Sequence, residues 1–259
     1  MQHDISHRLA EIETREKVRI FYACESGSRA WGFASQDSDY DVRFLYVRPV
    51  AWYLTIDAAR DVIERPIVDN IDLAGWDLKK ALRLFRKSNP PLIEWLHSPI
   101  VYLEKFSVTQ QWRALLPEFY RPVSCLYHYL HMAERNFRQH LQEETVWVKK
   151  YFYVLRPILA CRWIQAGYGP VPTEFAKLVE RVVESKPLRA AIDGLLILKT
   201  RGNELSWGPR QPVISEFIEH ELERLKHEDF GKQNQRPDTE KLNRLFRSAL
   251  HEVWSGEGI

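Results

Sequence analysis

The hydrophobic positions of the first fifty residues change their spacing twice. Ile5, Leu9 and Ile12 follow a helical period in a polar stretch, which predicts a surface helix over residues 3–17. Residues 20–24 are an unbroken run of strand-forming residues, and residues 39–47 alternate, so we expect two strands. In the second strand one face carries Tyr40, Val42, Phe44 and Tyr46, and the other carries Asp39, Asp41 and Arg43.

Farther along, the pattern separates a half that contains strands from a half that is helical. Residues 61–64 and 67–73 predict a short pair of strands interrupted at Pro66, and a helix follows over residues 78–87. Helical periods then cover residues 107–116, 122–144, 147–166, 172–185, 187–201, 211–226 and 237–254. The chain is therefore predicted to be an α+β protein with two domains, residues 1–105 and 106–259.

Composition narrows the class of protein. The 259 residues are enough for a substantial core, and the formal net charge is only +2, so a nucleic-acid site would be a local patch. Cys24, Cys125 and Cys161 lie in apolar surroundings and are expected to be buried free thiols. The sequence shows neither a signal pattern nor an apolar run of about 18 residues, so we expect a cytoplasmic protein without membrane segments.

Two carboxylates on the second predicted strand are the first candidates for chemistry. Asp39 and Asp41 project from one face, roughly 7 Å apart along the backbone. That spacing suits two divalent ions, which lie about 3.5–4 Å apart in two-metal phosphoryl-transfer sites. Gly27 and Ser28 form a turn after the first strand, where free backbone N–H groups suit a phosphate. A D-x-D pair alone is a weak signal, but its position after a strand and a Gly-Ser turn is far more restrictive.

These residues resemble a known family. Gly27-Ser28 followed by Asp39-x-Asp41 resembles the signature of the DNA-polymerase-β-type nucleotidyltransferase superfamily. The fuller sequence, G-S-R-A-W-G-F-A-S-Q-D-S-D-Y-D-V-R-F-L-Y, is similar to its RlaP-like branch, the RNA-ligase-associated polymerases. The resemblance continues in residues 72–77, 89–96 and 149–157 and covers roughly residues 15–170.

The resemblance implies a fold, a substrate and a third carboxylate. The implied fold is a mixed sheet with flanking helices, followed by an all-helical C-terminal half. A third carboxylate arrives from a later strand in the superfamily, and Asp72 is assigned that role, with Asp69 as the alternative. The implied substrate is a nucleoside triphosphate (NTP) with Mg²⁺ or Mn²⁺. The branch name implies an RNA end as acceptor, in a repair setting with an RNA ligase.

A helix near the middle of the chain carries the second candidate group. Lys149, Tyr153 and Arg156, at positions i, i+4 and i+7, form a stripe that could bind a triphosphate and stack on a base. The alternative is that this stripe is only the solvated face of the helix. Arg29, directly after the Gly-Ser turn, could contact phosphate. Asp77 is better explained as a helix N-cap than as a fourth metal ligand.

Two hypotheses follow. In the first, the chain is a nucleotidyltransferase in which Asp39, Asp41 and Asp72 are catalytic and bind metal. The residues expected to bind the nucleotide are Gly27, Ser28, Arg29, Lys149, Tyr153 and Arg156. In the second, the chain is a non-catalytic nucleotide-binding sensor or scaffold. We expect the first, because candidates for all three carboxylates are present; a protein or small-molecule acceptor stays open.

Overall fold

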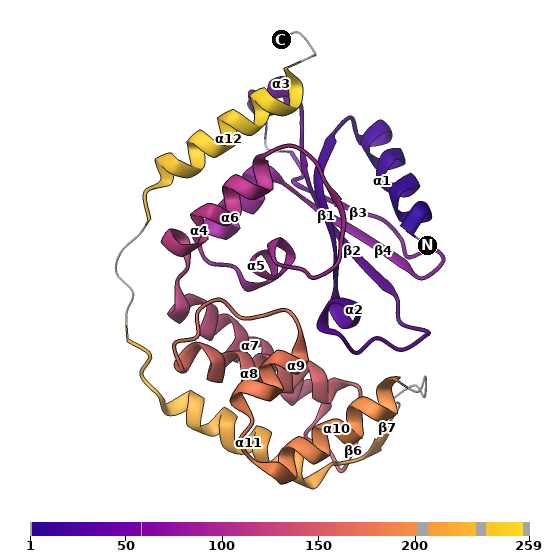
Figure 1. Cartoon of the computed structure of the whole chain (residues 1–259), viewed down its shortest axis with the longest axis vertical. Helices are drawn as coiled ribbons and strands as arrows, with labels where there is room; N and C mark the ends of the chain where they lie inside the picture. Colours follow the sequence, from indigo (N-terminus) through magenta and orange to yellow (C-terminus); the bar gives the residue numbers. More distant parts are fainter. Residues whose placement is uncertain (1, 58, 201–206, 232–236, 256–259) are drawn as a thin grey trace. The chain divides into compact units, whose positions relative to one another are not determined.

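A five-stranded mixed sheet lies at the centre of the N-terminal part of the chain. The computed structural model describes residues 2–57, 59–200, 207–231 and 237–255 (Figure 1). The strands are β1 (Arg19–Ser26), β2 (Tyr40–Val47), β3 (Val62–Glu64), β4 (Ile71–Asp77) and β5 (Val101–Glu104). Their order across the sheet is β3-β4-β2-β1-β5. β2 and β4 run parallel and the other neighbours antiparallel, so the predicted mixed sheet is confirmed.

The apolar face of this sheet is covered by α1 (Gln2–Glu16). Ile5, Leu9 and Ile12 of α1 are buried in one hydrophobic cluster with Val42 and Phe44 of β2. Figure 1 shows α1 along this side of the sheet. Each fully buried aliphatic side chain contributes about 1.5–3 kcal/mol, so the helical period of α1 and the alternation of β2 fix which face is inward. The opposite face of β2, with Asp41 and Arg43, is directed away from α1.

The later strands differ in part from the expectation. A strand was predicted over residues 67–73, but β4 begins only at Ile71. Asp69 and Asn70 have φ values of 52° and 58°, which place them in a turn. β5 pairs with β1 at the sheet edge and was not predicted, because none of its four residues is buried and the segment shows no core-facing pattern.

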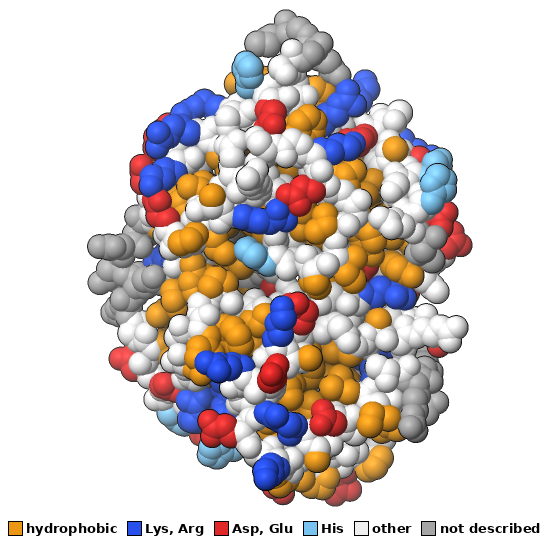
Figure 2. Space-filling view, viewed as in Figure 1, with side chains coloured by type: hydrophobic (Ala, Val, Ile, Leu, Met, Phe, Trp, Pro, Cys, Tyr) orange, Lys and Arg blue, Asp and Glu red, His pale blue; other side chains and the backbone are white. Residues whose placement is uncertain are grey.

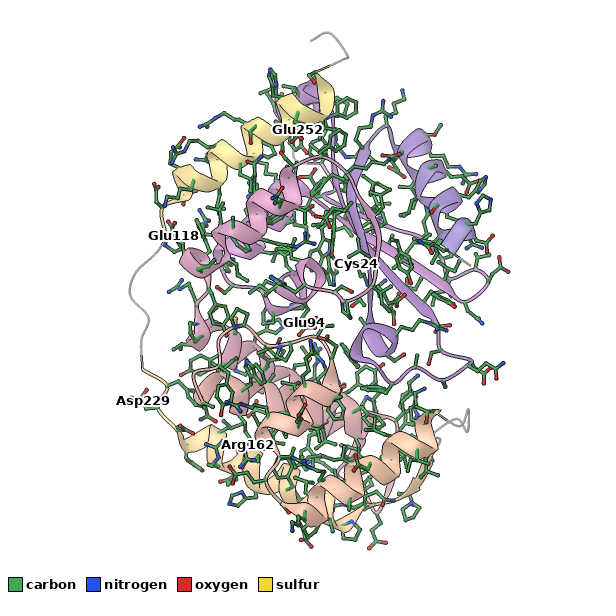
Figure 3. All side chains as sticks on the ribbon, in the orientation of Figure 1. Cys24, Glu94, Glu118, Arg162, Asp229 and Glu252 are labelled. Carbon is green, nitrogen blue, oxygen red and sulfur yellow. The ribbon has the colours of Figure 1, made fainter. Side chains whose placement is uncertain are left out.

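Several helices complete the unit that contains the sheet. They are α3 (Val50–Tyr53), α4 (Leu78–Arg86), α5 (Pro90–Leu96), α6 (Val108–Phe119) and α12 (Thr239–Trp254). The carboxylate of Glu252 on α12 accepts hydrogen bonds from the backbone N–H and the hydroxyl of Ser107 at 2.8 and 2.7 Å. Lys241 of α12 also pairs with Glu118 of α6 at 2.5 Å. Glu118 and Glu252 are labelled in Figure 3. The C-terminal helix therefore belongs to the unit formed by the N-terminal strands.

The remaining elements form a helical unit. Its helices are α7 (Pro122–His140), α8 (Lys150–Gln165), α9 (Phe175–Val182), α10 (Lys186–Thr200) and α11 (Pro212–His227). β6 (Thr145–Trp147) and β7 (Trp207–Pro209) add a small antiparallel sheet. The α+β class is thus confirmed, but the C-terminal half is not purely helical. The three-residue strand β3 was predicted, whereas β6 and β7 were not, because these two lie in the short connections between segments with a helical period.

The chain divides into two compact units whose segments alternate along the sequence. One unit takes residues 1–27, 39–120 and 235–259, and the other takes residues 28–38 and 121–234. This division does not coincide with the expected boundary after residue 105. The reasons are the return of α12 to the sheet unit and the aromatic packing of segment 28–38, in which Phe33 stacks on Phe152 at 4.7 Å.

Cysteine burial and surface charge agree with the composition. Cys24, Cys125 and Cys161 are free and buried, as expected. On the face drawn in Figure 2, basic and acidic side chains are interspersed among apolar ones. Within the described ranges, no helix is both long enough and apolar enough to cross a membrane.

Candidate active site

Strand register brings two of the three predicted carboxylates together. β2 and β4 are neighbouring parallel strands, and Asp41 is in register with Asp72. Their side chains are 31% and 28% exposed, so both reach solvent at the sheet surface. Asp39 lies before the first residue of β2 and is exposed. The structure therefore places Asp41 and Asp72 side by side, with Asp39 two residues earlier on the same chain segment.

A guanidinium group links the two carboxylates. Arg43 Nη2 donates to Oδ1 of Asp41 at 3.1 Å and to Oδ2 of Asp72 at 2.8 Å. Arg43 follows Asp41 by two residues and so shares its face of β2. Two adjacent carboxylates are costly without a cation, and Arg43 supplies one here. The alternation of β2 predicted Arg43 on this face, but no role was predicted for it.

The donor set of this pair suits a hard divalent cation. Carboxylate oxygens are preferred ligands of Mg²⁺ and Mn²⁺, and Arg43 shows that the space between Asp41 and Asp72 accommodates positive charge. Across the part of the chain that the structure describes, no three His, Cys, Asp or Glu side chains are gathered closely enough to hold a metal ion. Asp41 and Asp72 are thus the pair that would hold a metal, with Asp39 as the nearest further carboxylate in sequence.

Gly27 borders the carboxylate of Asp41. β1 ends at Ser26, and α2 (Gly27–Trp31) starts at once with Gly27 at φ +64°. A Cβ at residue 27 would lie 2.1 Å from Oδ2 of Asp41, well inside contact distance. Glycine is therefore required here both by its backbone angle and by the neighbouring carboxylate. The turn that was predicted to hold phosphate directly adjoins one of the predicted metal ligands.

A buried glutamate fixes the backbone of Asp41. Glu25 is 1% exposed, and its Oε1 accepts the backbone N–H of Asp41 at 2.8 Å. The hydroxyl of Tyr102 donates to Oε2, and the hydroxyl of Ser98 donates to the Glu25 carbonyl at 2.6 Å. Sequence reasoning missed Glu25, because a single acidic residue at the end of a strand gives no periodic signal.

The thiol of Cys24 lies opposite Arg43 in the sheet. Cys24 of β1, labelled in Figure 3, is the register partner of Arg43 and is fully buried. Burial raises the pKa of the Cys24 thiol to about 12, despite the nearby positive charge of Arg43. The thiol therefore stays protonated near neutral pH and is not a nucleophile of this site.

Arg29 and Ser28 belong to the segment assigned to the helical unit. Arg29 Nη2 donates to the carbonyl oxygen of Ser38 at 2.6 Å, and Lys199 of α10 donates to the hydroxyl of Ser35 at 3.1 Å. The carbonyl oxygen of Ser28 accepts the N–H of Phe33 at 3.1 Å. These bonds shape the loop that leads into Asp39. Contact of Ser28 or Arg29 with phosphate stays a prediction.

The stripe on α8 is placed differently from the expectation. Lys149 precedes the helix and is half-buried, but Arg156 is only 3% exposed. Arg156 Nη2 donates to the carbonyl oxygens of Pro172 and Thr173 at 3.4 and 3.3 Å. Nearly every side of α8 is buried, so a helical stripe there is not a solvated face. The roles of Lys149, Tyr153 and Arg156 toward a nucleotide stay predictions.

Trp31 connects this stripe to the short helix α2. The Trp31 ring meets the ring of Tyr153 edge-on at a centroid distance of 5.5 Å, and the guanidinium carbon of Arg156 lies 5.0 Å from the Trp31 centroid. Lys150, which sequence reasoning passed over, lies 4.6 Å from the centroid of the Tyr153 ring. The face of α8 with Tyr153 and Arg156 therefore packs against the helix that begins with the Gly-Ser turn.

Two other aspartates have roles outside the carboxylate pair. Asp69, the alternative to Asp72, pairs with Arg8 of α1 at 2.5 Å, and its side chain is 77% exposed. Asp77 accepts the backbone N–H of Lys79 at 2.8 Å, which confirms it as the N-cap of α4. Its other oxygen accepts the hydroxyl of Tyr53 at 2.6 Å.

Comparisons with known proteins agree with the sequence motifs. Residues 1–248 match the model of the RlaP family, described as "RNA repair pathway DNA polymerase beta family". The uncharacterized protein YcgL of Bacillus subtilis (strain 168) is 49% identical over 259 residues, which are 100% of each chain. A crystal structure of a nucleotidyltransferase-like protein from Exiguobacterium sibiricum 255-15 covers 100% of this chain and 92% of its own, at 12% identity and a TM-score of 0.35. The two sequence matches therefore establish the family to which this chain belongs.

Proposed function

The chain belongs to the RNA repair pathway DNA polymerase beta family, and we propose that it transfers a nucleoside monophosphate from an NTP to an acceptor hydroxyl. One observation of the structure carries this proposal. Asp41 and Asp72 come from separate parts of the sequence and meet in register on neighbouring parallel strands, beside Gly27. A purely structural sheet surface gains nothing from two adjacent carboxylates, whereas phosphoryl transfer depends on a site that concentrates positive charge at phosphate oxygens.

The proposal assigns each carboxylate a task. Asp41 and Asp72 would hold Mg²⁺ or Mn²⁺, and Asp39 would join them. A bound divalent ion neutralises charge on the triphosphate and lowers the pKa of a coordinated hydroxyl. Glu25 positions Asp41 by holding its backbone N–H, and Gly27 leaves the room that the Asp41 carboxylate needs. Positioning and charge neutralisation supply most of the rate in such reactions.

The reaction itself exchanges one phosphorus–oxygen bond for another. The acceptor hydroxyl oxygen bonds to the α-phosphorus of the NTP, and the bond from that phosphorus to the β-phosphate oxygen breaks. Asp72 takes the hydroxyl proton, and pyrophosphate leaves with the electron pair of the broken bond. Gly27 and Ser28, at the start of α2, would bind the departing phosphates through backbone N–H groups.

The acceptor in this proposal is an RNA end, with an RNA ligase acting in the same pathway. The support is the description of the family, which names RNA repair. The formal net charge of +2 adds no support, because a nucleic-acid site on such a chain would be a local patch. We also propose that Arg29, Lys149, Tyr153 and Arg156 contribute to NTP binding.

Labelled transfer decides between this function and nucleotide binding alone. The full chain is incubated with each α-³²P-labelled NTP, Mg²⁺ or Mn²⁺, and RNA, DNA, transfer RNA or total protein. We expect label on RNA ends and release of pyrophosphate, both lost in Asp72→Asn. Label on protein would show that the acceptor is a protein and not an RNA end. NTP binding without pyrophosphate release under any condition would indicate a sensor or scaffold instead.

A further inference from the structure

Arg43 contacts both carboxylates through a single nitrogen atom. Its Nη2 donates to Asp41 Oδ1 at 3.1 Å and to Asp72 Oδ2 at 2.8 Å. Its Nη1 donates to the carbonyl oxygens of Val42 and Asp72, each at 3.2 Å. A guanidinium group has five N–H donors, and these four bonds use all four on the terminal nitrogens. The group is therefore fixed between β2 and β4.

The oxygens that Arg43 contacts are the ones that a bridging ion requires. Oδ2 of Asp41 is directed at Gly27, where a Cβ would lie 2.1 Å away, so Oδ1 is the oxygen turned toward Asp72. Mg²⁺ binds oxygen at about 2.0–2.1 Å, closer than an N–H donor approaches. An ion held by Oδ1 of Asp41 and Oδ2 of Asp72 would overlap the position of Arg43 Nη2.

The charges of the three side chains also indicate that a divalent ion and Arg43 would exclude each other. Asp41 and Asp72 carry two negative charges, and Arg43 carries one positive charge. A divalent ion neutralises the pair alone, so a guanidinium group that stayed in place would face a dication at close range. The Arg43 side chain is 18% exposed, and solvent screens such a repulsion only partly.

We propose that Arg43 is a displaceable counter-ion: it holds Asp41 and Asp72 together without metal and leaves both when a divalent cation bridges them. Loading the pair then breaks two charge-assisted hydrogen bonds, so Arg43 raises the ion concentration at which the pair fills. Arg43 is a positioning residue in this scheme. The inference rests on the proposed function in one respect, namely that Asp41 and Asp72 bind a divalent cation.

Calorimetric titration of the full chain with Mn²⁺, in the absence of nucleotide, tests whether the ion displaces Arg43. Arg43→Gln should bind Mn²⁺ at least tenfold more tightly than the wild type. Arg113→Gln is the matched control, because Arg113 forms a similar ion pair with Glu104 at 2.6 Å, with side chains 30% and 33% exposed. Glu104 lies on β5, at the sheet edge beyond β1, so this variant should bind Mn²⁺ like the wild type.

A second measurement follows Arg43 in the wild type. Its side-chain N–H signals, assigned by their absence in Arg43→Gln or Arg43→Lys, should move toward those of exposed arginines as Mg²⁺ is added. This distinguishes departure of Arg43 from simple repulsion, which would leave the signals in place. Signals that stay unchanged while Mg²⁺ binds would overturn the proposal, even if Arg43→Gln binds Mn²⁺ more tightly.

The outcomes separate this inference from the proposed function. Loss of Mn²⁺ binding in Asp72→Asn, with no gain of affinity in Arg43→Gln, would overturn the exchange and leave the proposed function standing. Mn²⁺ binding that is equal in wild type and Asp72→Asn, or absent from both, would refute the proposed metal ligands and this inference together. Should Arg43→Gln fail to fold, Arg43→Lys provides the assignment and the wild-type Mg²⁺ titration decides.

Discussion

Gly27 and the carboxylate of Asp41 are so close that no side chain fits between them. A Cβ at residue 27 would lie 2.1 Å from Oδ2 of Asp41 and 2.9 Å from its Cγ. The glycine was expected to leave room for a phosphate, but its nearest neighbour is a predicted metal ligand. Substitution at this residue therefore acts first on Asp41.

A pair of glycine variants isolates this contact. Gly27→Ala and Gly32→Ala both place a side chain at positive φ, +64° and +89°, and each should lose about 1–2 kcal/mol of folding free energy. Only Gly27→Ala displaces Asp41, because nothing lies within 4 Å of a Cβ at Gly32. We expect Mn²⁺ affinity, measured by calorimetry, to fall at least tenfold in Gly27→Ala and to stay unchanged in Gly32→Ala. Equal affinities would show that the Asp41 carboxylate is not constrained by Gly27.

Removing a carboxylate charge should abolish transfer at little cost in stability. Asp39→Asn, Asp41→Asn and Asp72→Asn should each lose nucleotidyl transfer, while the free energy of urea unfolding changes by about 1 kcal/mol or less. Ion pairs at this degree of exposure, 31% for Asp41 and 28% for Asp72, contribute little to stability. Asp69→Asn is the matched control and should keep its activity. Near-wild-type transfer by Asp41→Asn at saturating Mg²⁺ would refute the metal assignment.

Asp77 predicts a dependence of stability on pH. Burial raises the pKa of Asp77 above its ordinary value of 3.8, so the folded state favours the protonated form. The stabilisation that the Asp77 carboxyl contributes is fully present below pH 3.8 and is lost as the pH rises through its folded-state pKa. Asp77→Asn keeps a cap for α4 without the charge, so its stability relative to wild type should increase above pH 3.8 in urea titrations. Asp77→Ala removes the cap and should lose about 0.5–2 kcal/mol. If the free energies of unfolding of wild type and Asp77→Asn differed by the same amount at every pH, burial of the Asp77 charge would be contradicted.

Variants of Lys149 and Arg156 separate nucleotide binding from folding. Arg156→Ala should destabilise the protein by about 1–3 kcal/mol, because buried carbonyl groups lose their donor. An increase in its apparent KM for NTP would therefore be hard to attribute to lost phosphate contact. Lys149 is half-buried, and its side chain makes no capping hydrogen bond at the start of α8. Lys149→Ala should unfold like the wild type and raise the KM about two- to fivefold, as expected for a charge contact that solvent partly screens. Normal transfer kinetics in Lys149→Ala would remove that residue from the site.

The parts of the fold that the sequence predicted are those with a clear apolar pattern, either a periodic spacing or an unbroken run. α1 buries one side and the first half of β2 alternates, so their periods are visible in the positions of Ile5, Leu9, Val42 and Phe44. β5, β6 and β7 bury at most one residue each, so they show no core-facing pattern, whereas the equally short β3 was predicted. Residues 67–73 were predicted as one strand, but positive φ angles at Asp69 and Asn70 turn the chain before β4.

The features of the candidate site likewise separate into those that the sequence predicted and those that it did not. Spacing along one strand predicted that Asp41 and Arg43 share a face, because that relationship is local, whereas Asp39 lies before β2 and its place on this face stays a prediction. The register of Asp41 with Asp72 is set by pairing between strands, and only the family resemblance pointed to it before the structure. The burial of Arg156 escaped prediction, because a helical stripe shows which residues align and not what covers them.

The alternation of the two units along the chain has a consequence for synthesis. The sheet unit starts with β1 and β2, but it is finished only when α12 emerges, after the whole of residues 121–234 has been made. A ribosome therefore releases every segment of the helical unit before the sheet unit can close, and the partly built sheet has to stay clear of aggregation during that interval. For the same reason, no single junction in a gene separates the two units. Neither can be traded between relatives by one recombination event, and the carboxylates of β2 and β4 are inherited together with the helices encoded between β4 and α12.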